Sequence, residues 1–231
     1  MNKRIEFPCT AELIALPELL LIVSTKASDN GNGIETGAIL FDLPHRTSIA
    51  QVAFTLHCEC NLNPSNKSYI ISCGKAGLTY FSTLVENADL IISHNITSIG
   101  HWFDTNSFLS INKPWICTMR DISWPIQKRL QSNPSIYDLA LAYHVPVWST
   151  NRPLIDCLYL SQVFERCPEL ETLIQNSLEP RQNYRAQASQ EENKLVQESG
   201  FTWDPLKGIW SRHLSAKEVI SLPFPVYPIS D

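Results

Sequence analysis

Polar side chains follow two apolar runs of the chain, at the point where each run would end as a strand. Leu19 to Val23 is continuously apolar and leads into Ser24-Thr25-Lys26, and Ala88 to Ser93 leads into His94-Asn95. Short apolar runs bounded by turn residues are typical of buried strands. In sheets with helices on both faces, chemistry gathers at the carboxyl ends of such strands. These residues therefore mark the expected functional edge of an α/β protein.

The cysteines offer a second kind of chemistry, metal binding. His57-Cys58 and Cys60, with Cys73 further on, come nearest to a zinc pattern. The usual two-residue gap between ligands is absent there. The seven cysteines are odd in number and are scattered through apparent strands and helices, and the sequence shows no secretory signal. We therefore expect free buried thiols and no zinc site.

Composition sets limits on the kind of protein. With 44% hydrophobic and 18% charged residues the chain should fold into a globular structure. The net charge of −5 argues against a wholly basic nucleic-acid surface and leaves a local basic groove open. No stretch has the apolar core of a signal peptide or the roughly 18 apolar residues of a membrane span. We expect a cytoplasmic protein with no membrane partner.

The elements that must position these residues alternate between strands and helices. Apolar alternation and apolar runs predict strands at 19–23, 37–43, 48–58, 88–93 and 115–119. Helical spacing predicts helices at 11–16, 75–86, 102–110, 122–130, 135–143, 154–166 and 168–178. A linker-like change in composition near 180–186 separates an expected domain at 1–180 from a small C-terminal module at 187–231.

Three motifs in this order resemble those of DEDDh-type 3′–5′ exonucleases, the family of the proofreading epsilon subunit of bacterial DNA polymerase III. They are IVSTKAS after the first strand, IISHN after the later strand, and NRPLIDC at the opening of a helix. PWICTM, Trp124-Pro125 and VPVW support them. The resemblance covers about residues 16–178. It implies an RNase H-like fold, which is an α/β fold with a mixed five-stranded sheet flanked by helices, from a bacterial branch with a small C-terminal α+β module.

The family hydrolyses phosphodiesters with two divalent metals, which four carboxylates hold, and a histidine acts as general base. Its motifs are D-x-E, an aspartate five residues after the second motif's histidine, and H-x-x-x-x-D. In this sequence those five positions are occupied by Ser24, Lys26, Ile99, Asn151 and Asp156. The resemblance therefore implies that Asp156 alone is kept and that the catalytic site is degenerate.

These replacements predict a pseudo-exonuclease that needs no cofactor. Lys26 places a cation where a metal would lie, and two unit charges about 4 Å apart repel by roughly 4 kcal/mol at an effective dielectric of 20. A divalent ion doubles that repulsion, and Asn151 cannot take up a proton. Because a buried carboxylate without a partner is costly, we predict that Lys26 pairs with Asp156. The alternative is that both side chains are hydrated in an open cleft.

Two other functions stay open. Asp29, Glu35, His101 and Asp104 lie near the motifs and would be the substitute ligands of an active, Mg²⁺- or Mn²⁺-dependent 3′–5′ exonuclease. The third possibility is a protein-interaction scaffold without affinity for nucleic acid.

A retained binding role is the leading expectation, with single-stranded nucleic acid or a DNA- or RNA-processing complex as partner. The candidate nucleic-acid contacts are Thr25, His94, Asn95, Arg152, Lys207 and Arg212. His94-Asn95 should also hold the turn after its strand by side-chain hydrogen bonds. Of the six tryptophans, Trp203 and Trp210 are expected in the core of the module, and Trp115, Trp124 and Trp148 in the main core or a groove wall.

Overall fold

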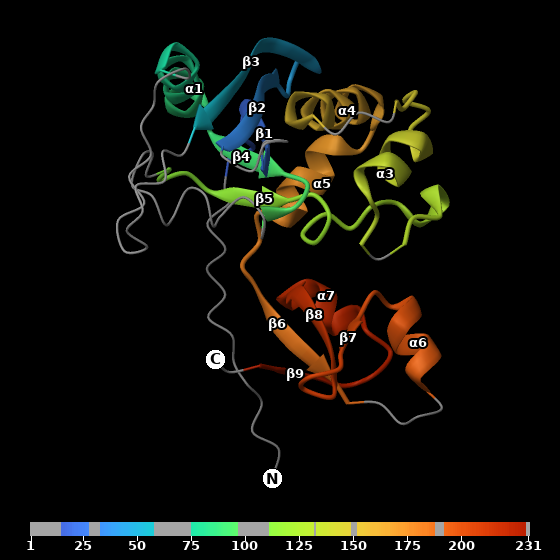
Figure 1. The fold of residues 1–231 in the computed structure, drawn as a ribbon. Helices are drawn as coiled ribbons and strands as arrows, with labels where there is room; N and C mark the ends of the chain where they lie inside the picture. Colours follow the sequence, from blue (N-terminus) through green and yellow to red (C-terminus); the bar gives the residue numbers. More distant parts are fainter. Residues whose placement is uncertain are drawn as a thin grey trace, which may run out of the picture.

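The first sheet of the computed structural model is mixed and five-stranded. The structure describes residues 15–27, 33–57, 75–96, 111–131, 133–148, 152–187 and 192–229. The strand order is β3 (Thr47–His57), β2 (Gly33–Asp42), β1 (Leu19–Ala27), β4 (Leu90–Ser93) and β5 (Trp115–Cys117). Strand β1 pairs antiparallel with β2 and parallel with β4. The expected α/β class with a mixed five-stranded sheet is confirmed (Figure 1).

Strand β1 is buried on both faces, because its apolar run supplies side chains to two hydrophobic cores. Leu20 and Ile22 belong to the core under α3 (Ile136–Ala142), α4 (Pro153–Arg166) and α5 (Leu170–Ser177). Leu21 and Val23 belong to the opposite core, under α1 (Lys75–Asn87). Successive side chains of a strand point to opposite faces. A continuous apolar run is therefore what this central position requires.

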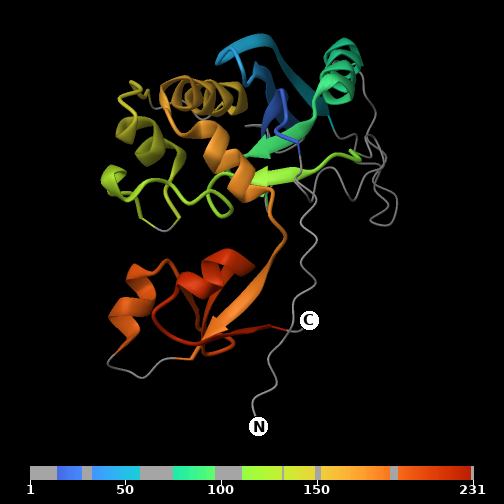
Figure 2. The same cartoon turned by 180° about the vertical axis from the view of Figure 1, so that it is seen from behind.

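A second sheet follows α5 directly (Figures 1 and 2). Its strand order is β7 (Thr202–Asp204), β8 (Ile209–Ser215), β6 (Arg181–Ala186) and β9 (Val226–Pro228), with helices α6 (Asn193–Glu198) and α7 (Ala216–Ser221). Its buried core residues are Tyr184, Val196, Phe201, Leu214 and Phe224. The residues at 181–186, which look linker-like in sequence, form the strand β6 at the centre of this sheet.

Two further expectations from the sequence are wrong. The helix expected at 122–130 is reduced to one 3₁₀ turn, η1 (Ile126–Lys128), which Arg129 ends with a left-handed φ of 53°. Trp203 is not a core residue, since 47% of it is exposed, and it packs beside Trp210 with ring centroids 5.5 Å apart. The expected helix at 102–110 and most of that at 11–16 lie outside the described residues. Within the described ranges, no helix combines the length and apolar character needed to cross a bilayer.

Candidate functional site

Lys26 and Asp156 form an ion pair at the carboxyl end of β1. The Nζ of Lys26 lies 3.0 Å from Oδ2 of Asp156, and Ser24 Oγ donates a hydrogen bond to the same oxygen at 3.3 Å. Ser24 and Lys26 are two residues apart on β1, so both point to the face that α4 covers. The predicted pair is confirmed, and three of the five motif positions are brought together.

Gly37 is the reason that α4 lies so close to the sheet. It is the register partner of Ser24 on β2. A Cβ at Gly37 would lie 2.3 Å from the backbone nitrogen of Leu154, in the first turn of α4. Cys157 Sγ also donates to the Gly37 carbonyl at 3.3 Å. The missing side chain at this position lets the first turn of α4 bring Asp156 within reach of β1.

A second ion pair lies beside the first. Glu35 is the register partner of Lys26, and its Oε2 accepts a hydrogen bond from Arg152 Nη1 at 2.9 Å. Each pair joins one cation to one anion, so the charges of the four side chains sum to zero. Sequence reasoning named Glu35 as a substitute metal ligand and Arg152 as a nucleic-acid contact. It did not foresee that they pair with each other.

His94 supports the floor of the site through both ring nitrogens. Nδ1 lies 3.0 Å from Thr118 Oγ1, and Nε2 lies 3.0 Å from the Pro134 carbonyl oxygen. Burial lowers the pKa of His94 below 6.5, and this outweighs the opposing effects of the Pro134 hydrogen bond and the Asp156 charge. A neutral ring that donates from Nε2 and accepts at Nδ1 satisfies this geometry. The expected role in holding the turn after β4 agrees with these bonds.

A pocket of about 300 Å³ opens beside the ion pair. Its lining comes from β1, β4, α3 and α4 and comprises Ile22, Val23, Ser24, Thr25, Lys26, Ser93, His94, Asn95, Ile136, Asp156, Cys157 and Leu160. Asp156 Oδ1 is buried there without a hydrogen-bond partner among the described residues. Asn95 is exposed. The pocket therefore keeps polar atoms for a ligand.

Among the residues that the structure describes, the donor set of this pocket does not fit a divalent metal. Mg²⁺ requires near-octahedral oxygen coordination, and Ca²⁺ takes six to eight oxygens. The pocket supplies one carboxylate, whose Oδ2 already binds the Lys26 ammonium. In the part of the chain that the structure describes, no three His, Cys, Asp or Glu residues gather as a metal site.

Several candidate residues lie outside the described ranges. They are Asp29, Ile99, His101, Asp104 and Asn151, together with Cys58, Cys60 and Cys73 of the weak zinc pattern. Cys117, Cys157 and Cys167 are free and buried, as expected of thiols in a core. Burial also raises the pKa of the Cys157 thiol well above its ordinary value, which makes it unreactive.

The six candidate nucleic-acid contacts fall into two groups. Thr25, His94 and Asn95 line the pocket, and Arg152 lies beside it at the start of α4. Lys207 and Arg212 belong to the second sheet. Lys207 is exposed, whereas Arg212 donates from Nη1 to the Ser199 carbonyl at 2.6 Å. The candidates therefore do not form one continuous surface.

Asp121 links the two sheets, a role that sequence reasoning missed. Its carboxylate accepts hydrogen bonds from the Cys117 amide, Arg120 Nε and His213 Nδ1, at 2.8, 2.9 and 3.2 Å. Burial opposes ionisation, but these bonds and the Arg120 charge hold its pKa at about 2. A signal was present, because Asp121 is a polar residue just after the apolar run at 115–119. Polar residues directly after a predicted strand also marked the ends of the strands predicted at 19–23 and 88–93.

Comparison with known proteins adds one finding. A family described as a domain of unknown function (DUF8626) matches residues 182–229, which span nearly all of the second sheet. No curated protein matches the chain.

Proposed function

We propose that this chain is a catalytically inactive, exonuclease-like protein of RNase H-like fold that binds single-stranded nucleic acid. The observation that carries the proposal is the 3.0 Å contact between Lys26 Nζ and Asp156 Oδ2. In the family that the motifs resemble, these positions would hold metal-binding carboxylates. An ammonium group here supplies the positive charge and leaves no site for a divalent ion.

Electrostatics explains why hydrolysis fails. A divalent ion placed about 4 Å from the ammonium is repelled by roughly 8 kcal/mol at an effective dielectric of 20, twice the value for two unit charges. Ser24 presents a neutral hydroxyl instead of a carboxylate. Asn151 stands at the position of the general base and cannot accept a proton near neutral pH. Metal binding and proton abstraction are therefore both lost.

The binding role is supported by the pocket beside the ion pair and by the exposed polar side chains around it. The pocket of about 300 Å³ keeps one buried carboxylate oxygen, Asp156 Oδ1, without a hydrogen-bond partner among the described residues. Arg152 is 57% exposed at its edge, and Asn95 is exposed. Exposed cations and amides contact phosphates without reading sequence. The proposed partner is single-stranded DNA or RNA, held as part of a larger DNA- or RNA-processing complex.

Fluorescence anisotropy with labelled single-stranded DNA and RNA, over a salt series, tests the binding role. We expect affinity to fall as salt rises, because phosphate contacts release counterions. Arg152→Gln should weaken binding, whereas Leu206→Gln, at an exposed turn residue of the second sheet, should leave it unchanged. If neither the single-stranded DNA nor the single-stranded RNA bound even at low salt, the binding role would be wrong. A protein-interaction scaffold would then be favoured.

A further inference from the structure

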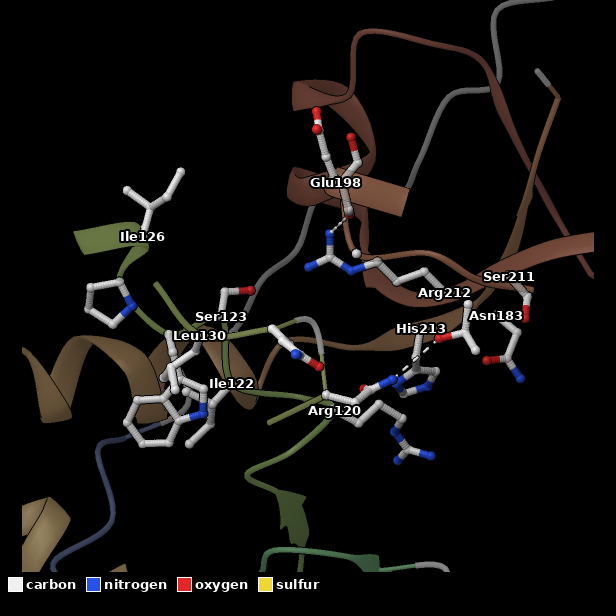
Figure 3. Close-up of a pocket in the computed structure, with 17 residues that line it drawn as sticks. Arg120, Ile122, Ser123, Ile126, Leu130, Asn183, Glu198, Ser211, Arg212 and His213 are labelled. Atoms are coloured by element: carbon white, nitrogen blue, oxygen red, sulfur yellow. Dashed lines mark hydrogen bonds between the residues drawn. The ribbon is translucent and has the colours of Figure 1, made fainter. Parts of the chain in front are cut away.

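A second cavity lies between residues that follow β5 and the second sheet (Figure 3), and none of its lining residues lines the pocket beside the Lys26–Asp156 pair. Its volume is about 460 Å³, which lies within the roughly 300–1,000 Å³ of small-molecule sites. We call it the interdomain cleft. One wall comes from residues 120–131 and Asn133, between β5 and α3, and the other from β6, β8 and the end of α6.

The two walls of the interdomain cleft differ in chemistry. Ile122, Trp124 and Leu130 form the apolar side, and Ile126 adds a side chain that is 86% exposed. The Trp124 indole N–H donates to the Thr118 carbonyl at 2.9 Å, which fixes the ring in place. A fixed aromatic ring beside aliphatic side chains suits a planar, apolar body.

Arg212 supplies the charge on the opposite wall. Figure 3 shows its guanidinium reaching toward the side of the cleft that carries Ser123 and Leu130, whereas the Arg120 guanidinium points away. Gly200, with a φ of 85°, lies directly beneath Arg212, since a Cβ there would come within 3.2 Å of the guanidinium carbon. Together with the bond to Ser199, this contact holds the guanidinium in one place.

The positive charge of Arg212 is only partly compensated. Its nearest carboxylate contact is Glu218 Oε1 at 3.6 Å, while Arg181 takes Oε2 of the same residue at 2.7 Å. One carboxylate thus serves two guanidinium groups. Glu198, which also lines the cleft, is exposed and pairs with Lys194 at 3.8 Å. An anionic ligand group would complete the charge balance at Arg212.

Amide side chains complete the lining. Gln131, Asn133 and Asn183 add amide donors and acceptors to the lining, and Asn133 Nδ2 donates to Thr202 Oγ1 at 3.3 Å. An alkyl chain would offer these amides no hydrogen bond, and a purely ionic ligand would leave the apolar wall exposed. We propose that the interdomain cleft binds a nucleoside monophosphate, with its phosphate at Arg212 and its base against Trp124. This proposal does not rest on the proposed function, because the cleft shares no residue with the pocket at Lys26.

Isothermal titration of the full chain with AMP, adenosine and inorganic phosphate tests the site. We expect saturable AMP binding, with adenosine and phosphate each at least about tenfold weaker, because each lacks one of the two anchors. Arg212→Lys should weaken AMP about tenfold, since it keeps the charge but loses the planar fork. Ile126→Asp should also weaken AMP binding, because it places a carboxylate at the edge of the apolar wall, where it repels the anionic ligand.

Leu206→Asp is the matched control, because Leu206 is 97% exposed and does not line the cleft. It should bind AMP like the original chain. Ile126→Asp keeps the test decisive if Arg212→Lys fails to fold, since Ile126 projects into solvent. The proposal is overturned if AMP gives no heat at millimolar concentration, or if Ile126→Asp binds AMP unchanged. It is also overturned if Lys26→Gln abolishes AMP binding, which would place the ligand in the other pocket.

Discussion

Lys26 and Asp156 meet across β1 and α4, with the Lys26 Nζ 3.0 Å from Oδ2 of Asp156. The side chains are 25% and 14% exposed, so the pair is partly withdrawn from water. Ser24 shares the same carboxylate oxygen. The contact joins the central strand to the helix that packs on it, and it links the stability of this interface to the proposed loss of catalysis.

Breaking this pair on one side should destabilise the fold. Among the described residues, Lys26→Met leaves Asp156 with the Ser24 hydrogen bond alone as a side-chain contact to its carboxylate. We expect the free energy of unfolding to fall by about 1–3 kcal/mol. Chemical denaturation of Lys26→Met, Asp156→Leu and the double variant gives the coupling energy. We expect a coupling of about 1 kcal/mol or more. Additive effects of the two substitutions would show that the pair contributes nothing.

Gly37→Ala should push α4 away from the sheet. The new Cβ would lie 2.3 Å from the Leu154 nitrogen, and both atoms are backbone-fixed. We expect a loss of at least about 2 kcal/mol in the free energy of unfolding. Ala53→Ser is the control, because Ala53 is exposed on β3 directly opposite Gly37. A stable Gly37→Ala variant with the Lys26–Asp156 pair intact would contradict the role given to Gly37.

The elements that sequence predicts well are those with a strong apolar signal. The continuous run of β1 and the helical spacing of α4 correspond to elements buried against the core. Strand β6 was missed because only Tyr184 within it is buried. It forms because β8 and β9 pair with it on both sides, and that partnership depends on residues far along the chain. A polar strand held by its neighbours has no local signature.

The site shows the same division. The pairing of Lys26 with Asp156 followed from motif spacing and the cost of an unpaired buried carboxylate. The Glu35–Arg152 pair could not be foreseen, because it depends on the register between β1 and β2 and on the approach of α4 at Gly37. At 122–130 the apolar residues do not form a helix, since Arg129 takes a left-handed conformation and ends the single turn.

The link between the two sheets should weaken in acid. The folded pKa of Asp121 is about 2, below its ordinary value of 3.8. Its ionised form therefore stabilises the fold above about pH 4, by about 2 kcal/mol, and this contribution is lost as the pH falls toward 2. Asp121→Asn should be less stable at neutral pH and show a flatter stability profile in this range. The free energy of unfolding is measured by urea denaturation at several pH values for the original protein and for Asp121→Asn. The same dependence on pH in both would exclude a stabilising role for the Asp121 carboxylate.

His94 should make stability depend on pH in a second range. Its folded pKa lies below 6.5, because the buried ring favours the neutral form. Stability is therefore complete above about pH 6.5 and declines as the pH falls toward the folded pKa. NMR titration of the histidine ring protons should assign His94 a midpoint below 6.5. A midpoint at or above that value would contradict the burial and hydrogen bonding of this ring.

The most direct measurement of the central claim is Mn²⁺ binding by electron paramagnetic resonance, at neutral pH, on the original chain and on Asp156→Asn. The Lys26 ammonium should prevent binding at this pocket, so the free Mn²⁺ signal should be the same with both proteins. Stoichiometric uptake of Mn²⁺ that Asp156→Asn abolishes would show that the carboxylate still holds a metal. In that case the proposal of an inactive, metal-free site would be wrong.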